Sequence, residues 1–198
     1  MLRVYLGGPD VFLADPDRVG RIKREICGEF GFEGLYPLDN DKDARVDAAR
    51  IFRANCRLLR QADLGLFNLT PFRGPSADAG TAFELGFLFA SGKPVCGYSA
   101  DESTYRTRVE ASSCVVNENG RSWDADGHAI EDFGVADNLM IVRAIEESGG
   151  IFTAVAEETR NPGNSLAAFA AFRTCVRRMQ QLFMPAGANR GGRWEKEE

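Results

Sequence analysis

Apolar residues along the chain follow two different spacings, and their alternation predicts an α/β fold. Short apolar runs bounded by glycine, proline or aspartate have the length and composition of buried strands. Between them lie longer segments in which apolar residues recur every three or four positions, as on one face of a helix. The predicted strands are 3–6, 34–38, 62–69, 95–98 and 112–116, and the predicted helices are 16–30, 46–59, 81–91, 137–147 and 165–183.

The order of these elements predicts how they assemble. Strands that alternate with helices form a parallel sheet covered on both faces, which is a doubly wound fold. A chain of 198 residues suits a single domain. We expect this domain over 1–185, followed by a glycine-rich, charged and mobile tail over 186–198. The turn sequences Asn119-Gly120 and Asp124 to Gly127 predict a small excursion that carries Trp123.

Composition narrows the range of partners. A formal net charge of −5 disfavours binding to nucleic acid, which depends on clustered lysine and arginine, so a small ligand is expected. No apolar run approaches the roughly 18 residues of a membrane span, and the chain begins directly with a strand rather than a signal peptide. The cysteines are odd in number and never in CxxC spacing, which favours reduced thiols in a cytoplasmic setting over disulfides or zinc. They are Cys27, Cys56, Cys96, Cys114 and Cys175.

The ligand site is expected at one edge of the predicted sheet. In an open parallel sheet, ligands bind outside the carboxyl ends of the strands, which here are the segments 7–12, 36–40 and 70–78. Asp63 lies at the opposite end of its strand, so a capping or turn role is expected for it. Arg73, in a Pro-Phe-Arg-Gly turn, is expected to be solvated, with contact to a phosphate or base as the alternative.

Two carboxylates near the start of the predicted helix 81–91 are candidates for chemistry. Asp78 precedes the helix, where an acid is favoured by unpaired amides and the helix dipole, so Asp78 by itself fits an N-cap. Glu84 lies a turn inside the helix among large apolar residues, at the expected edge of the core. Because desolvating a carboxylate is costly, its presence there indicates a function. The apolar face of this helix is predicted to consist of Phe83, Phe87 and Ala90.

Known cofactor fingerprints do not occur in the sequence. Gly7-Gly8-Pro9 follows the first strand but is not GxGxxG, and there is no GxxxxGK[ST] motif, so neither the dinucleotide nor the triphosphate signature is present. Gly8 fits either a tight turn or a close approach of the backbone to a ligand. Asp10 beside it is expected to repel phosphate. His128, the single histidine, has no ligand set near it and is expected in a surface loop, so we expect neither a metal nor a cofactor.

Several separated motifs, in this order and spacing, resemble a known family. They are YLGGPDVF at 5–12, YPLD at 36–39, DAGTAFELG at 78–86, GKP at 92–94 and DNLM at 137–140. In these residues the chain resembles the nucleoside 2-deoxyribosyltransferase family from Val4 to about Met140. The resemblance implies a flavodoxin-like sheet flanked by helices. It also implies transfer of 2-deoxyribose between nucleobases, with retention, through a covalent deoxyribosyl enzyme.

The resemblance assigns expected roles residue by residue. Glu84 matches the nucleophile that attacks the anomeric carbon, Asp78 a carboxylate that holds the sugar and tunes the nucleophile, and Tyr5 a tyrosine that orients it. A core role is the alternative for Tyr5. Phe12 and the Asp39-Asn40 turn lie where the family stacks and reads the base.

Two further positions concern neighbouring subunits and the leaving base. Asn138 matches an asparagine that reaches the sugar's 5'-hydroxyl in a neighbouring subunit, which implies a homo-oligomer with shared sites; capping of a helix is the alternative. Asn55 stands where many relatives carry an acid, and an amide cannot protonate a departing base. The proton source is therefore open among Asp39, Asp78 and water.

The chemistry leaves three functions to compare. A carboxylate can trap the cation formed when an N-glycosidic bond breaks, and a base then completes a transfer. If water completes the reaction instead, the protein is a nucleoside or nucleotide N-glycoside hydrolase. A non-catalytic nucleoside-binding domain is the third function, because fold alone does not define activity. The transferase acting on nucleosides is the leading hypothesis.

Overall fold

The computed structural model describes residues 1–37, 47–155 and 165–184. Five strands within these ranges form one sheet in the order β2-β1-β3-β4-β7, and every neighbouring pair is parallel. This order is that of a flavodoxin-like, doubly wound sheet, which confirms the predicted single-domain fold class. The strands are β1 (Leu2–Gly7), β2 (Phe32–Leu35), β3 (Leu64–Asn68), β4 (Val95–Ser99) and β7 (Phe152–Ala154).

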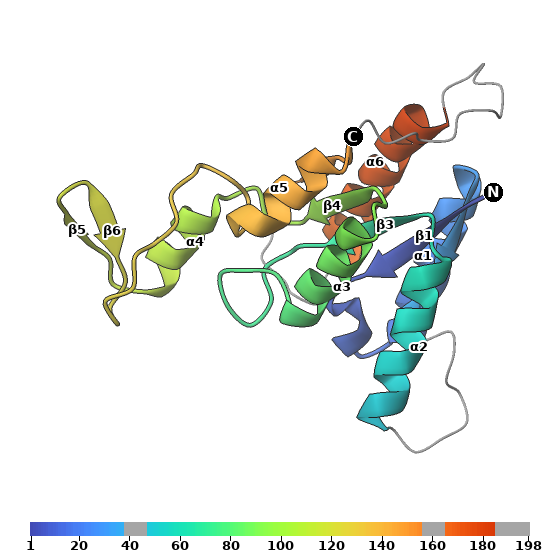
Figure 1. Cartoon of the computed structure of the whole chain (residues 1–198), viewed down its shortest axis with the longest axis horizontal. Helices are drawn as coiled ribbons and strands as arrows, with labels where there is room; N and C mark the ends of the chain where they lie inside the picture. The colour runs from blue at the N-terminus through green and yellow to red at the C-terminus, as the bar shows by residue number, and fades with distance from the viewer. Residues whose placement is uncertain (38–46, 156–164, 185–198) are drawn as a thin grey trace.

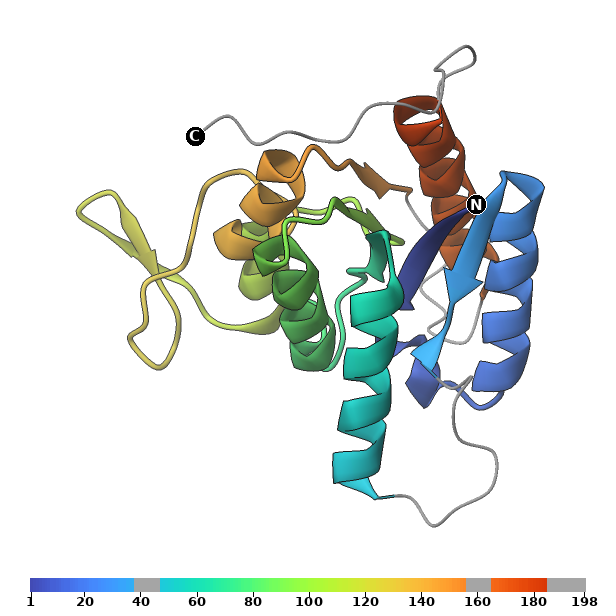
Figure 2. The ribbon, with the colours of Figure 1, turned by 45° about the vertical axis from the view of Figure 1, so that its right-hand side comes forward.

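Helices cover both faces of this sheet (Figures 1 and 2). On one face α1 (Pro16–Glu29) packs beside α6 (Ser165–Phe183), and on the other α3 (Ala79–Ala90) packs against α2 (Ala48–Gln61) and α5 (Leu139–Glu147). Strand side chains alternate between the two resulting cores because successive residues of a strand point to opposite faces. Val4 and Leu6 therefore pack with α1 and α6, while Tyr5 packs on the side of α2 and α3.

The segment after β4 differs from the prediction. A strand was expected at 112–116, but the chain forms helix α4 (Tyr105–Ser112), capped by Thr104, and then a hairpin of β5 (Val116–Glu118) and β6 (Arg121–Trp123). The hairpin projects away from the main sheet (Figure 1). It turns through Asn119 and Gly120, both at positive φ, as a type I′ hairpin turn requires. The expected excursion carrying Trp123 is confirmed. The fifth strand of the sheet is instead β7, which has three residues.

The predicted buried face of α3 is also wrong. The residues of α3 that are buried are Thr81, Leu85 and Leu88, whereas Phe83 is 53% exposed. Apolar side chains surround nearly the whole helix, so their spacing does not single out one face. The remaining elements agree with the prediction to within about two residues at most ends; β2, however, begins at Phe32 and ends at Leu35.

Three predicted features fall on residues outside the described ranges. They are the Asp39-Asn40 turn, the residues at the end of the second predicted strand and start of the second predicted helix, and the tail over 186–198. Within the described part of the chain, no helix combines the length and the apolar run needed to cross a bilayer.

Candidate active site

A cavity of about 800 Å³ opens at the carboxyl end of β1. Its wall is formed by the turn η1 (Pro9–Phe12), the N-terminal half of α2 and the first turns of α3. This is the edge at which open α/β sheets bind ligands, and the volume suits a small molecule. The cavity is lined by Gly8, Val11, Phe12, Asp17, Pro37, Ile51, Ala54, Asn55, Asp78, Gly80, Thr81 and Glu84.

Glu84 lines this cavity and accepts hydrogen bonds from two neighbouring side chains. The hydroxyl of Tyr5 donates to Glu84 Oε1 at 2.6 Å, and the Asn55 amide donates to the same oxygen at 3.4 Å. Burial raises the pKa of Glu84 to about 7; the Tyr5 hydrogen bond opposes this rise, the charge of Asp78 adds to it, and the Asn55 hydrogen bond opposes it. Near neutral pH the carboxyl group is therefore present both ionised and protonated.

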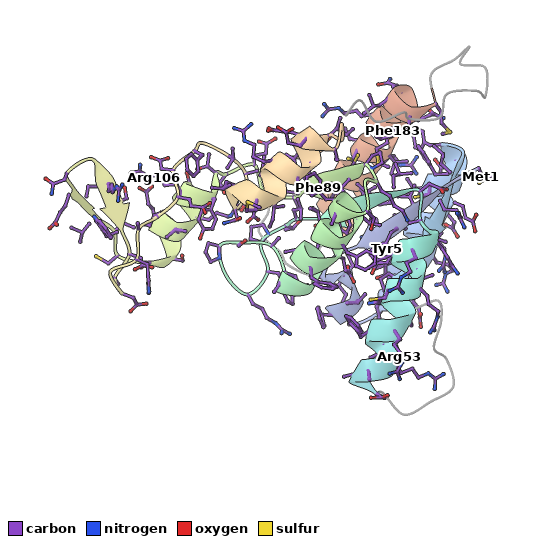
Figure 3. The ribbon with its side chains drawn as sticks, in the orientation of Figure 1. Met1, Tyr5, Arg53, Phe89, Arg106 and Phe183 are labelled. Atoms are coloured by element: carbon purple, nitrogen blue, oxygen red, sulfur yellow. The ribbon has the colours of Figure 1, made fainter. Side chains whose placement is uncertain are left out.

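Tyr5 acts on ionised Glu84 as a hydrogen-bond donor. Its side chain is fully buried (labelled in Figure 3), and both this burial and the charge of Glu84 raise the pKa of the phenol well above its ordinary value. The hydroxyl thus keeps its proton throughout the range in which Glu84 ionises. Because it engages Oε1, the second carboxylate oxygen, Oε2, is left for other partners.

Asp78 has a structural role and a position in the cavity at the same time. Its Oδ2 accepts hydrogen bonds from the Thr81 amide at 2.9 Å and the Thr81 hydroxyl at 3.2 Å, which makes it the N-cap of α3 and confirms the capping interpretation. The same residue lines the cavity and lies near enough to Glu84 to raise its pKa.

Asn55 contributes an amide to the cavity from α2. Its Nδ2 is directed at Glu84, as described above. Its Oδ1 is buried and has no hydrogen-bond partner among the described residues, so the amide retains an unused acceptor close to the carboxyl group.

A buried ion pair supports the turn after β1. The carboxylate of Asp10 lies 2.5 Å from Lys23 Nζ, and both of its oxygens accept from the Asn68 amide at 3.2 Å. Lys23 is 2% exposed and lies over the rings of Tyr98 and Phe172. Because the charge of Asp10 is compensated and its side chain does not line the cavity, this carboxylate gives no reason to exclude phosphorylated substrates.

Sequence reasoning missed Lys23. It lies on the apolar face of α1 between Val19 and Ile26, and a lysine at such a position signals a buried partner. The turn also depends on Gly8, whose φ is +153°. A Cβ there would lie 2.6 Å from the Cβ of Asn68. This close packing explains the glycine without a ligand.

The aromatic ring of Phe12 lines the cavity. Phe12 is 58% exposed and stacks on Phe72, with 5.3 Å between ring centroids and 13° between ring planes. The guanidinium of Arg73 lies 4.6 Å from the Phe72 ring centroid and 5.3 Å from that of Phe12. Arg73 is exposed, as expected, but it also covers this aromatic pair.

Three residues considered from the sequence lie elsewhere. Asn138 is not among the cavity residues of its own chain; its Oδ1 caps α5 at the Met140 amide and its Nδ2 donates to Glu131. Asp63 accepts from the backbone amide and guanidinium of Arg3 at the opposite end of β3, which confirms a structural role. His128 is exposed on the loop after β6. Among the residues that the structure describes, no three metal-ligating side chains converge.

Comparison with known proteins identifies relatives over most of the chain. Residues 4–140 match the profile of the family described as nucleoside 2-deoxyribosyltransferase. An uncharacterised protein of Schizosaccharomyces pombe is 32% identical, with 77% of this chain and 80% of that protein covered.

Solved structures with the same fold include a 2-desoxiribosyltransferase from Leishmania mexicana. It is 28% identical, covers 88% of this chain and 98% of its own, and has a TM-score of 0.60. A conserved protein from Enterococcus faecalis V583 is 22% identical, covers 90% of this chain and 99% of its own, and has a TM-score of 0.54, which is a likeness of fold.

Proposed function

Because this chain belongs to the nucleoside 2-deoxyribosyltransferase family, whose enzymes act on nucleoside glycosidic bonds, we propose that it transfers 2-deoxyribose between nucleobases. The observation that carries this proposal is the partly buried carboxyl group of Glu84, held by Tyr5 inside a cavity at the ligand-binding edge of the sheet. Free nucleosides and bases are the proposed substrates.

The proposed reaction has two displacements at the anomeric carbon. In the first, an oxygen of ionised Glu84 forms an ester with the sugar while the N-glycosidic bond breaks and the base leaves with its electron pair. In the second, a nitrogen of the acceptor base attacks the same carbon and the ester bond breaks, which restores the carboxylate. Two inversions give net retention.

The geometry around Glu84 favours one oxygen as the nucleophile. Tyr5 and Asn55 both donate to Oε1, so Oε2 is the oxygen proposed to attack. Gly7 lies beside Oε2: a Cβ at this residue would be 2.9 Å from it. The absence of a side chain at Gly7 therefore leaves space next to the reacting oxygen.

The departing base needs a proton or a hydrogen bond on the nitrogen that gains charge. Asn55 supplies only an amide, which can hydrogen-bond a base but cannot protonate it. Asp78 lines the same cavity and is a candidate proton donor, as is water. Asp39 is the third candidate and lies outside the described residues. Phe12, whose exposed ring lines the cavity, is proposed to stack on the base.

Product analysis distinguishes the three candidate functions. Purified protein is incubated with 2'-deoxyinosine and adenine, and the products are separated by chromatography, with Glu84→Gln and the exposed-site control Glu118→Gln alongside. New 2'-deoxyadenosine in the wild type and the control, but not in Glu84→Gln, supports the transferase.

Other products would redirect the proposal. Hypoxanthine and free deoxyribose without new nucleoside would indicate the hydrolase. Because Asp10 is neutralised by Lys23, 5'-phosphorylated substrates belong in the same panel. Tight nucleoside binding without turnover of any substrate would identify a binding domain and overturn the proposed activity.

We further propose a homo-oligomer in which Asn138 serves the site of a neighbouring subunit. In support, Asn138 caps α5 and is not part of the cavity in its own chain. Mixing two inactive variants tests this: Glu84→Gln retains Asn138, Asn138→Ala retains Glu84, and a mixed oligomer contains sites with both residues. Activity on mixing supports shared sites, and no recovery in a proven mixed oligomer contradicts them.

The five free cysteines support a reducing, cytoplasmic setting for this enzyme.

A further inference from the structure

A buried ion pair lies beside the cavity without lining it. Arg108 of α4 is 8% exposed and Asp137, just before α5, is 1% exposed, and Nη2 of the arginine lies 3.7 Å from Oδ2 of the aspartate. A buried ion pair gains little net stability, because desolvation of both charges offsets their attraction. The hydrogen bonds that Arg108 and Asp137 make to neighbouring loops indicate a role in positioning those loops.

The guanidinium of Arg108 holds three loops together. Its Nε donates to the Pro75 carbonyl at 2.6 Å, its Nη1 to the Ser103 carbonyl at 2.6 Å, and its Nη2 to the Ala136 carbonyl. The planar, five-donor fork of arginine makes these contacts at the same time, which a lysine ammonium does not reproduce.

Asp137 holds the next two residues of one of these loops. Its Oδ1 accepts from the Ser76 hydroxyl, and its Oδ2 accepts from the Ala77 amide at 2.9 Å. Together with the Arg108 contact at Pro75, three consecutive residues are fixed. The residue that follows them is Asp78, the cavity carboxylate that caps α3.

We propose that Arg108 and Asp137 are positioning residues for the active site, which fix the segment 75–77 and thereby set the location of the Asp78 carboxylate relative to Glu84. The ion pair touches neither the cavity nor Glu84, so it acts through Asp78. Asp137 Oδ1 also accepts from the backbone amide of Asn138, the N-cap residue of α5, at 2.7 Å. The same carboxylate therefore binds both the segment that leads to Asp78 and the residue that caps α5.

The first test measures the pKa of Glu84 and needs no enzyme activity. In Arg108→Gln the segment 75–77 loses its hydrogen bond at Pro75 and Asp137 loses its cation, so we expect Asp78 to move away from Glu84 and the repulsion between the two carboxylates to weaken. The pKa of Glu84, followed by NMR titration of its carboxyl carbon and assigned with Glu84→Gln, is expected to fall below the wild-type value of about 7. Arg106→Gln is the matched control: Arg106 lies on the same helix (labelled in Figure 3), but it pairs with Glu110 and Asp132 at the surface.

The second test measures turnover and rests on the proposed function. Arg108→Gln should lower kcat/KM on the order of a hundredfold, as a misplacement of about 1 Å does, and Arg106→Gln should not. If the wild type has no glycosyl-transfer activity, the proposed function fails, while the titration still decides the positioning role. A Glu84 pKa that is the same in wild type, Arg108→Gln and Arg106→Gln overturns the positioning role.

A milder variant covers the case in which Arg108→Gln does not fold. Ser76→Ala leaves the ion pair intact and removes one hydrogen bond to Asp137. Its Glu84 pKa is expected to shift in the same direction by a smaller amount. An unchanged pKa in folded Ser76→Ala then counts against the proposal.

Discussion

Replacing Glu84 by glutamine should make the protein more stable above neutral pH while removing the proposed nucleophile. Burial raises the pKa of Glu84 from its ordinary 4.5 to about 7, so the folded protein holds a proton that the unfolded chain releases. Stability contributed by the protonated group is fully present below pH 4.5 and is lost as the pH rises through 7. Glutamine is neutral throughout, and its carbonyl can still accept from Tyr5 and Asn55.

The size of the effect follows from the difference between the two pKa values. Each pKa unit corresponds to about 1.4 kcal/mol, so the rise from 4.5 to about 7 corresponds to roughly 3 kcal/mol of unfolding free energy. Glu84 is only partly buried, so solvent screening reduces this figure. Glu84→Gln and wild type should therefore be similar in stability near pH 4 and differ by up to roughly 3 kcal/mol at pH 8.

Urea denaturation across this pH range measures the difference. The free energies of unfolding of wild type, Glu84→Gln and Glu118→Gln are compared at each pH, and Glu118 is chosen because its side chain is exposed on the hairpin. Glu118→Gln should follow the wild type closely. If the difference between wild type and Glu84→Gln does not change between pH 4 and 8, burial does not perturb Glu84 and the reasoning fails.

Three other substitutions test the surroundings of the site. Tyr5→Phe removes a hydrogen bond that favours ionised Glu84, so the acid limb of kcat/KM against pH should move above pH 7, and an unmoved limb would contradict this. Lys23→Met leaves the buried charge of Asp10 uncompensated and should cost about 3–5 kcal/mol in urea unfolding, much of it recovered by adding Asp10→Asn. Gly8→Ala puts a Cβ 2.7 Å from the Asp10 carboxylate and should lower the melting temperature, at a cost of about 1–3 kcal/mol; an unchanged melting temperature would show that the turn adjusts freely.

Elements with a strong periodic pattern were predicted well. Helix α6 spans Ser165–Phe183, the predicted range, because its apolar residues recur at helical spacing over many turns. Helix α4 was missed because its buried residues are Arg108 and Val109, and a buried arginine leaves no apolar pattern. Strand β7 has three residues, which is too short for any pattern to be read.

The candidate site was predictable wherever it depended on strand ends. Gly8, Phe12 and Asp78 line one cavity, as expected for residues near the carboxyl edge of a parallel sheet. Asn55 and Glu84, which lie on helices and were singled out with the help of the family resemblance, line the same cavity. The supporting ion pairs were not predictable in the same way, because each depends on a partner brought close only by the fold.

The burial of the cysteines has a practical consequence for experiments on this protein. Four of the five thiols are enclosed, and burial raises the pKa of Cys27 and Cys96 to about 12, which suppresses their reactivity. Cys114 is exposed, between α4 and the projecting hairpin. A thiol-reactive fluorophore will therefore attach at one position of the unmodified chain, and the hairpin can report by fluorescence when another molecule approaches it.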